Sequence, residues 1–187
     1  MKFLVVGLGN IGVEYLDTRH NIGFNILDAF SEASNFSFDP DRLAYKGIAK
    51  YKGRTLVCIK PTTYMNLSGK AVNYWMQTEK IPIQNILVIT DDIAISLGTL
   101  RLKSKGSDGG HNGLKDIQNT LGTNIYSRLR FGIGDEFNHG RQVDFVLSKW
   151  NEDELIRIPE RIEKSIEIIR SFVTIGAERT MSAFNNK

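Results

Sequence analysis

Three glycines directly after an apolar stretch constrain the fold of this chain more than any other feature. Residues 3–6, FLVV, favour a buried strand, and Gly7, Gly9 and Gly12 complete the pattern G-x-G-x-x-G. Glycine lets a chain turn tightly off a buried strand. The pattern predicts the first strand of an α/β sheet and places Asn10 at its carboxyl end, where open α/β sheets bind their ligands.

The same glycines are the fingerprint of dinucleotide-binding sites, in which a helix begins inside the motif and faces the pyrophosphate. Here Gly12 is followed by VEYLDTRHN, which is polar and lacks helical periodicity, and the next predicted strands form a hairpin instead of a parallel βαβ unit. We therefore expect no cofactor. A nicotinamide-dependent oxidoreductase stays an alternative, which a titration with NAD(H) or NADP(H) would exclude.

The periodicity of the chain predicts an α/β fold: one three-layer domain over 1–187, with a mixed, mostly parallel central sheet and helices on both faces. KGIAKY and RTLVCIK are typical of two strands joined by the two-residue turn Lys52-Gly53. NILVITDD at 85–92 is a continuous apolar run, which is typical of a strand buried on both faces.

Two further strands are predicted in the second half of the chain. SRLRFGIG at 127–134 alternates in a way that places Arg128 and Arg130 outward against inward apolar residues. VDFVLSKW at 143–150 favours a last strand.

Helices are predicted where apolar residues recur at spacings of three and four. Asn66 or Ser68 is expected to cap the second helix, and Asn112 the third, which Gly122 ends. Pro159 must kink or begin the last helix. The predicted segments are 22–30, 67–75, 112–121 and 155–173.

Composition excludes several classes of protein. The longest apolar runs are far shorter than a membrane span, so we expect a soluble, cytoplasmic protein with no membrane contact. Cys58 is the only cysteine, which rules out disulfides within the chain and a cysteine zinc cage and favours a small buried hydrophobe. The three histidines have no metal-motif spacing, so no metal is expected. Asp91 and Asp92 as metal ligands stay an alternative.

The distribution of charge says more than its sum. The chain carries a net charge of +3, whereas the window from Thr99 to Arg130 alone has six basic residues against two acidic ones. This window predicts a basic patch of the kind that binds nucleic acid. A solvated surface with unpaired lysines is the alternative.

Polar residues gather beside predicted strand ends and helix N-termini, where they share one crevice in this interpretation. His20 lies just before the first helix, whose N-terminus disfavours an imidazolium and keeps the ring able to accept a proton. Asp91 ends a buried strand and is placed to fix the tautomer of such a base. No serine or cysteine stands out as a nucleophile, so water takes that role. Neutral amides that can position a carbonyl or an oxyanion are Asn10, Asn66 and Asn112.

Four motifs in this order, GLGNIGVEYLDTRHNIGF, KPTTYMNLSGKAV, ITDD and GSDGGHNGLKDI, resemble the bacterial-type peptidyl-tRNA hydrolase family. The resemblance runs from about residue 3 to the C-terminus, and four motifs at family spacing are far more specific than three glycines. It implies a metal-independent esterase that cleaves the bond between a peptide and the 3′ ribose of tRNA. Such an enzyme recycles tRNA from aborted translation and has peptidyl-tRNA as its partner.

The resemblance also implies roles for individual residues. His20 matches the catalytic base, Asp91 the aspartate that supports it, and Asn10 the asparagine that helps to distinguish peptidyl from free aminoacyl substrate. Tyr15 matches a residue that contacts the 3′ end of the substrate. The crevice that positions the ester, the peptide and the terminal adenosine is matched by Tyr64, Met65, Asn66, His111 and Asn112. The basic positions that hold the tRNA acceptor stem are matched by Lys103 and Arg130.

The chain departs from the family pattern at two places. The segment Ile93–Ser96 replaces a continuation that usually carries another acidic residue, which puts the local loop geometry in doubt. Asp108 stands in the glycine-rich loop where a small or neutral residue is usual, and its charge is expected to weaken tRNA binding. Asp108→Ser should then lower the Michaelis constant at low salt.

A second class of function stays open at this point. An organellar relative of the family serves in RNA splicing, so the fold and a basic groove do not guarantee turnover. The presence of His20, Asp91, Asn10 and Asn112 favours the enzyme, and we expect it to act as a monomer without an obligate protein partner.

Overall fold

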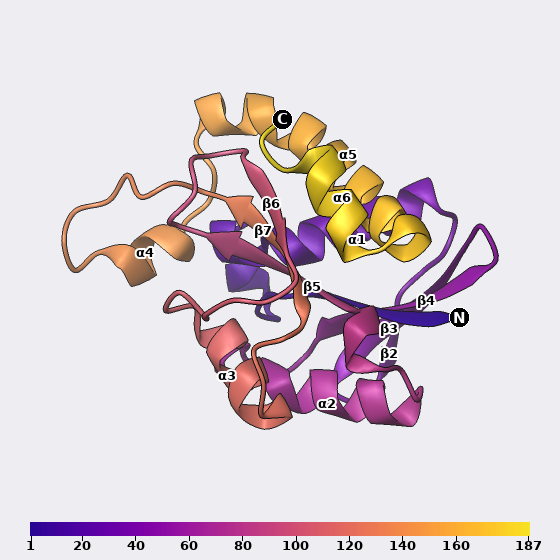
Figure 1. Cartoon of the computed structure of the whole chain (residues 1–187). Coiled ribbons are helices and arrows are strands. Elements are labelled where there is room, and N and C mark those ends of the chain that lie inside the picture. The colour runs from indigo at the N-terminus through magenta and orange to yellow at the C-terminus, as the bar shows by residue number, and fades with distance from the viewer.

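A computed structural model describes residues 1–187 and places seven strands in one central sheet, in the order β2-β3-β4-β1-β5-β7-β6 (Figure 1). The four central strands β4, β1, β5 and β7 run parallel, whereas β2, β3 and β6 pair antiparallel. The predicted mixed sheet is therefore confirmed, parallel in its centre and antiparallel at both edges. The strands are β1 (Lys2–Gly7), β2 (Asp39–Asp41), β3 (Ala44–Tyr51), β4 (Arg54–Pro61), β5 (Ile86–Asp92), β6 (Leu100–Lys103) and β7 (Ser127–Gly132).

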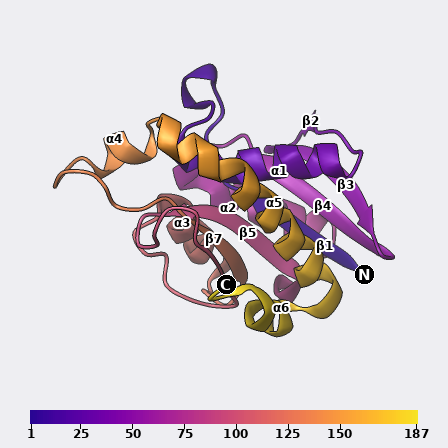
Figure 2. The ribbon, with the colours of Figure 1, turned by 90° about the horizontal axis from the view of Figure 1, so that it is seen from above.

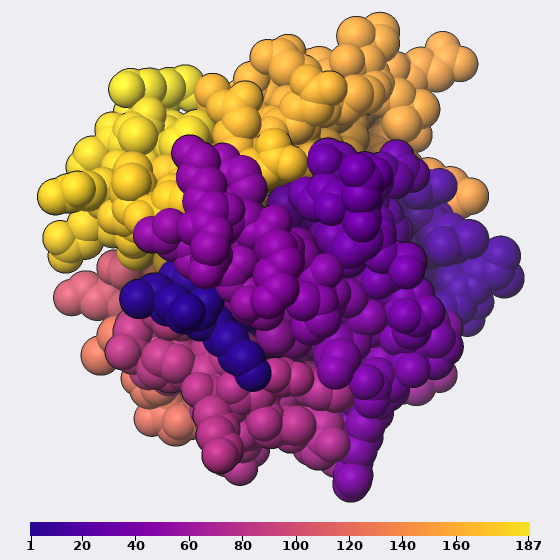
Figure 3. Space-filling model, turned by 90° about the vertical axis from the view of Figure 1, so that its right-hand side faces the viewer, coloured from indigo at the N-terminus to yellow at the C-terminus, as the bar shows by residue number.

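Helices cover both faces of the sheet, as predicted: α1, α5 and α6 lie on one face and α2 and α3 on the other (Figures 1 and 2). In Figure 3 the two C-terminal helices, orange and yellow, lie along the top of a face built mainly by the first half of the chain. No helix is both long and apolar enough to cross a membrane. The helices are α1 (Ile22–Ala33), α2 (Ser68–Thr78), α3 (Asn112–Leu121), α4 (Gln142–Val146), α5 (Glu152–Ile175) and α6 (Ala177–Phe184), and the short 3-10 turns are η1 (Val13–Tyr15), η2 (Arg19–Asn21), η3 (Met65–Leu67) and η4 (Ile83–Asn85).

Alternation along β1 divides the buried side chains into two cores. Phe3 and Val5 pack toward α1 and α5, whereas Leu4 and Val6 pack toward α2 and α3. Each fully buried side chain of this size contributes about 1.5 to 3 kcal/mol relative to exposure to water. An apolar run without alternation is therefore what a central strand requires.

Gly7 ends β1 where the backbone of α1 passes directly against it. A Cβ at Gly7 would lie 2.3 Å from the carbonyl oxygen of Gly23, and a Cβ at Gly23 would lie 2.5 Å from the amide nitrogen of Leu8. The glycines thus allow a strand and a helix to touch backbone to backbone. Only the three-residue 3-10 turn η1 begins at the end of the glycine motif, and α1 begins at Ile22, so the motif lacks the α-helix N-terminus that a dinucleotide fingerprint requires.

The predicted hairpin is confirmed. Lys52 and Gly53 have φ values of 46° and 78°, and Tyr51 pairs with Arg54 across the turn. Two consecutive positive φ values are the mark of a type I′ turn, whose twist matches that of the flanking strands.

The predicted last strand over 143–150 is wrong, because this segment contains α4, and its one β-type pairing is an isolated bridge between Thr18 and Lys149. Val143, Phe145 and Leu147 alternate as in a strand, whereas Val143 and Val146 are three residues apart, which suits one helical turn. The edge of the sheet is occupied by β6, which the sequence analysis did not predict.

Helix starts also differ from the predictions. Neither Asn66 nor Ser68 caps α2 through its side chain, since the Ser68 hydroxyl donates to the carbonyl of Met65. Pro159 does not begin α5, because Asn151 and Glu154 form a capping box that starts the helix at Glu152.

Both edges of the sheet are protected. At one edge, the side-chain amide of Asn185 accepts from the Leu102 N–H and donates to the Leu102 carbonyl, at 2.9 Å each. At the other edge, β2 is only three residues long and contains Pro40 between two aspartates. Short, charged or covered edges prevent strand addition from a second chain.

Candidate active site

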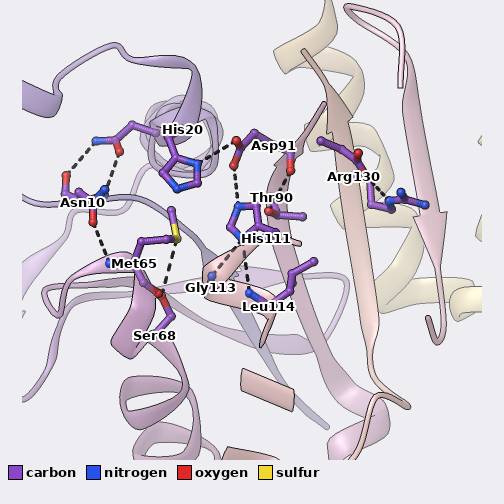
Figure 4. Close-up of polar contacts among 12 residues, drawn as sticks. Asn10, His20, Met65, Ser68, Thr90, Asp91, His111, Gly113, Leu114 and Arg130 are labelled. Atoms are coloured by element: carbon purple, nitrogen blue, oxygen red, sulfur yellow. Dashed lines mark hydrogen bonds and ion pairs between the residues drawn. The ribbon is translucent and has the colours of Figure 1, made fainter. Parts of the chain in front are cut away.

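Asp91 joins two histidines at the carboxyl end of β5 (Figure 4). Its Oδ2 lies 2.8 Å from Nδ1 of His20, and its Oδ1 lies 2.8 Å from Nε2 of His111. His20 comes from η2 and His111 directly precedes α3. Three segments far apart in the sequence therefore meet at one carboxylate, which is only 3 % exposed.

The bonds of His111 fix its tautomer. Its Nδ1 accepts from the backbone N–H groups of Gly113 and Leu114, at 3.1 and 3.4 Å, so this nitrogen carries no proton. The proton is on Nε2, which donates to Asp91. His111 is therefore the N-cap of α3, and the prediction that Asn112 caps this helix is wrong. A ring nitrogen takes the place that a serine or asparagine oxygen usually fills.

His20 presents its other nitrogen to the solvent side. Because Asp91 accepts from Nδ1–H, the Nε2 atom carries the lone pair, and it makes no hydrogen bond to the protein. Burial lowers the pKa of His20, but the charge of Asp91 and this hydrogen bond outweigh burial and raise the pKa above its ordinary value of 6.5. The helix N-terminus is expected to lower the pKa of His20, and the influence of Asp91 outweighs this effect.

Asp91 is held in its ionised form. Burial by itself raises the pKa of a carboxyl group, yet the two histidines, through charge and hydrogen bonds, bring the pKa of Asp91 well below its usual range. A buried carboxylate that accepts from both rings is a fixed negative charge beside the open nitrogen of His20.

Two histidines and a carboxylate within 4.8 Å have the composition of a metal site. Their hydrogen bonds do not suit one, because Nε2 of His111 carries a proton and both oxygens of Asp91 accept from the rings. A cation would have to displace the protons between the rings and Asp91 and break the cap of α3. Asp92 adds no ligand, because it points away from Asp91 to Arg130 and to the N–H of Ala94.

Asn10 is a buried link between the glycine turn and η2. Its backbone N–H donates to Oδ1 of Asn21 at 2.8 Å, and Nδ2 of Asn21 donates back to its carbonyl at 2.9 Å. Its own Oδ1 accepts from the N–H of Met65 at 2.7 Å. The side-chain NH₂ of Asn10 stays without a protein partner, which leaves it free to donate.

A cleft with a volume of about 90 Å³ opens beside the two histidines. One wall is the loop from Ser107 to Asn112, and the opposite wall includes Val143 and Val146 of α4. Of the predicted site residues, the cleft collects His20, Asp91, His111, Asn112 and Arg130.

The other predicted site residues lie outside this cleft, and the buried Asn10 is one of them. Met65 is buried and linked to Asn10, whereas Tyr64 is 61 % exposed. Asn66 and Lys103 are exposed, and Tyr15 is partly buried in η1.

Of the two arginines predicted to face outward, Arg130 is the one residue of β7 that is not buried, whereas Arg128 is buried. Arg130 forms an ion pair with Asp92 at the cleft. Arg128 is 1 % exposed and donates to the carbonyls of Gly106 and Asn124, at 3.1 and 2.7 Å. The prediction that Arg128 faces outward is wrong, because both faces of β7 are covered, and this cation anchors the start of the glycine-rich loop instead.

Comparison with known proteins shows to which family the chain belongs. The family model described as Peptidyl-tRNA hydrolase matches residues 4–187. The chain belongs to the peptidyl-tRNA hydrolase family. It is therefore a hydrolase, and its substrate is peptidyl-tRNA.

Relatives agree over the full length. The peptidyl-tRNA hydrolases of Bacteroides fragilis and Cytophaga hutchinsonii are each 54 % identical over 187 residues, which is 100 % of both chains in each case. The crystal structure of peptidyl-tRNA hydrolase from Acinetobacter baumannii has a TM-score of 0.92 at 32 % identity, with 98 % of this chain and 94 % of that chain covered. The predicted resemblance to this family is confirmed.

Two residues that position the peptidyl-tRNA hydrolase site without lining its cleft are not among the predicted ones. Asn21 and Arg19 flank His20 in the quoted motif, so their position was available as a signal. The wall formed by α4 was not, because its segment carries no polar motif and was predicted as a strand.

Proposed function

We propose that His20 is the general base that activates water for attack on the ester between the peptide and the 3′ ribose of tRNA. The observation that carries this proposal is the open Nε2 of His20 beside a buried carboxylate that holds the Nδ1 proton. This combination fixes the tautomer a base needs and stabilises the imidazolium that forms.

In the proposed reaction, water loses a proton to Nε2 of His20 while its oxygen bonds to the ester carbonyl. The tetrahedral intermediate then expels the ribose oxygen, which takes the proton back from His20, and the products are a peptide carboxylic acid and free tRNA. Positioned proton transfer of this kind contributes roughly 100- to 10,000-fold in rate. Donors for the developing oxyanion are the free NH₂ of Asn10 and the side chain of Asn112.

The chemistry is proposed to need no metal ion. The support is the hydrogen bonding of Asp91, whose two oxygens and two histidine protons are already matched. The same bonds assign His111 to positioning Asp91 and α3, with no free nitrogen for the substrate.

Substrate contacts beyond the cleft are proposed for residues around its rim. The exposed side chains of Tyr64 and Asn66 are open to the peptide or the terminal adenosine, and Tyr15 to the 3′ end. Met65 is buried, so its part is to hold Asn10 through its backbone N–H.

The tRNA acceptor stem is proposed to lie against Lys103 and Arg130. Support comes from the register of the edge strand, in which Arg101 pairs with Arg130 while both Arg101 and Lys103 are exposed. Because Arg130 is paired with Asp92, a phosphate would share it with that carboxylate. Phosphate contacts make binding salt-dependent and indifferent to sequence.

In the cell, such an enzyme recycles tRNA from stalled or aborted translation, and we propose that it does so in the cytoplasm as a monomer. Gel filtration of the protein alone and with tRNA tests the oligomeric state.

The deciding experiment measures release of the N-blocked amino acid from N-acetyl-aminoacyl-tRNA, with and without EDTA. Wild type should turn over in both conditions, and His20→Ala should lose at least about 100-fold in kcat. His139→Ala, which removes the exposed histidine outside the cleft, is the matched control and should behave as wild type. Undiminished turnover by folded His20→Ala would refute the assigned base, and loss of activity in EDTA would refute the metal-free mechanism.

A further inference from the structure

The turn η2 sends three consecutive side chains to three different parts of the active site. A 3-10 turn has three residues per turn, so neighbouring side chains point about 120° apart. Arg19 reaches Lys149 and Glu154, His20 reaches Asp91, and Asn21 reaches Asn10. The residue that carries the proposed base thus lies between two tethers.

Arg19 is buried and makes several polar contacts with the segment after α4 and with α5, which together form a tether. Arg19 is 5 % exposed, and its Nη2 donates to Oε2 of Glu154 at 2.7 Å. Its Nη1 donates to the hydroxyl of Ser148 and to the carbonyl of Lys149, the latter at 2.9 Å, and its guanidinium lies 4.3 Å from the centre of the Phe145 ring. A planar fork is required to meet these partners together.

Glu154 connects this tether to a helix. The same Oε2 that accepts from Arg19 accepts from the N–H of Asn151 at 2.8 Å, which is half of the capping box of α5. The backbone N–H of Arg19 also donates to the carbonyl of Ser148 at 3.0 Å. The ends of the segment that follows α4 are therefore fixed to η2 on one side and to α5 on the other.

α4 lies at the periphery of the protein, as Figures 1 and 2 show, and packs on the core through the partly buried side chains of Phe145 and Val146. It is five residues long, and Val143 is 65 % exposed although it lines the cleft. A helix this short gains little stability from its own hydrogen bonds. Its place in the cleft wall therefore depends on this packing and on the contacts at its end.

We propose that Arg19 is a positioning residue that sets the width of the substrate cleft, by holding the α4 wall at a fixed place relative to His20. It acts through Glu154 and the 145–149 backbone and touches neither the ring of His20 nor Asp91. The inference rests on the proposed function of the cleft, in which the reacting end of peptidyl-tRNA lies between α4 and the loop of His111.

A purely structural Arg19 would give different kinetics. Loss of folded protein lowers the apparent kcat and leaves KM unchanged, because the remaining molecules are normal. A displaced wall weakens binding of ground state and transition state alike, which raises KM more than it lowers kcat. The pH midpoint of activity is unaffected in both cases.

The experiment compares Arg19→Met, Arg19→Lys, Glu154→Gln and the double variant Arg19→Met with Glu154→Gln, each assayed well below its unfolding temperature. Arg170→Met is the matched control, since Arg170 lies over the Phe30 and Tyr51 rings away from the cleft. We expect Arg19→Met to raise KM about fivefold or more with kcat within about threefold of wild type. Arg19→Lys should recover part of the loss, and the double variant should be no worse than Arg19→Met.

Three outcomes overturn the inference: a wild-type KM in folded Arg19→Met, additive losses in the double variant, or the same rise of KM in Arg170→Met. Failure of the proposed function is distinguishable, because the wild type itself would then release no product. If Arg19→Met fails to fold, Arg19→Lys carries the test, because a lysine keeps a cation beside Glu154 but lacks the planar fork, and a wild-type KM in that variant overturns the inference.

Discussion

At the scale of single residues, the active site depends on one carboxylate that accepts hydrogen bonds from two histidine rings. Asp91 accepts from His20 with one oxygen and from His111 with the other. The tautomer of His111 follows from its role as a helix cap, and the tautomer of His20 follows from Asp91. The N–H groups at the start of α3 therefore fix the proton on His111, and Asp91 fixes the proton on Nδ1 of His20, which leaves Nε2 of His20 open.

This arrangement makes the pH dependence of activity specific. The reaction needs neutral His20, so kcat/KM should rise with pH through the pKa of His20, and Asp91 raises that pKa above 6.5. In Asp91→Asn the charge is lost and burial acts alone, so the midpoint should move to lower pH. The plateau rate should fall by at least about 100-fold, because the imidazolium loses its counter-charge.

The measurement is a pH profile of kcat/KM for both proteins at constant ionic strength. A midpoint of Asp91→Asn at or above that of wild type would contradict the coupling of the two groups. His139→Ala serves again as the control, since its profile should match that of wild type.

At the scale of elements, His111 has two separable duties, as the cap of α3 and as the partner of Asp91. Asparagine is a good N-cap but is too short to cap the helix and reach Asp91 together. We therefore expect His111→Asn to be about 1 kcal/mol more stable than His111→Ala, with both variants equally low in kcat.

Urea unfolding and steady-state kinetics on the same preparations check this prediction. Equal stability of the two variants would show that the ring nitrogen does not cap α3. Recovery of kcat in His111→Asn would show that the contact with Asp91 is dispensable.

Elements were predictable where one physical demand dominated. The apolar runs of β1 and β5 and the Lys52-Gly53 turn each admit one structure. The segment around Val143 does not, because a short stretch with apolar spacings of two and three suits a strand or a helical turn. The cap of α3 escaped prediction because histidine seldom caps a helix, and only the geometry shows its Nδ1 accepting.

At the scale of the whole molecule, the site is assembled from contacts that the sequence does not display. His20 and Asp91 are 71 positions apart, and nothing in their spacing shows that they touch. The motifs and the rule that ligands lie at strand ends were enough to place them in one crevice. These rules do not predict the burial of Arg128, because strand alternation places this arginine on the outward side.

The distribution of charge over the molecule sets how tightly tRNA binds. Asp108 lies at the cleft and its Oδ1 accepts from the N–H of Gly110 at 2.8 Å, so it shapes the glycine-rich loop as well as adding negative charge. Asp108→Asn keeps an acceptor there and removes the charge. Its KM for peptidyl-tRNA should fall at low salt, as expected for Asp108→Ser, and should approach the wild-type value at high salt.

Titration of KM against salt concentration is the measurement, with Asp108→Ser and Lys103→Ala beside it. Lys103→Ala should raise KM at low salt and make its salt dependence shallower by about one phosphate contact. A KM of Asp108→Asn that equals or exceeds wild type at every salt concentration would show that the charge of Asp108 does not act on tRNA.

The two hydrogen bonds between the side chain of Asn185 and the backbone of Leu102 have a consequence for the peptide part of the substrate. Its substrate carries an unfinished, extended polypeptide, and extended chains readily join any strand that offers a free row of N–H and C=O groups. At Leu102 both groups are already taken by a side chain of the same molecule, and the opposite edge offers a proline. The released peptide therefore finds no free backbone groups to pair with at these two places. It can leave without adding to the sheet as an eighth strand.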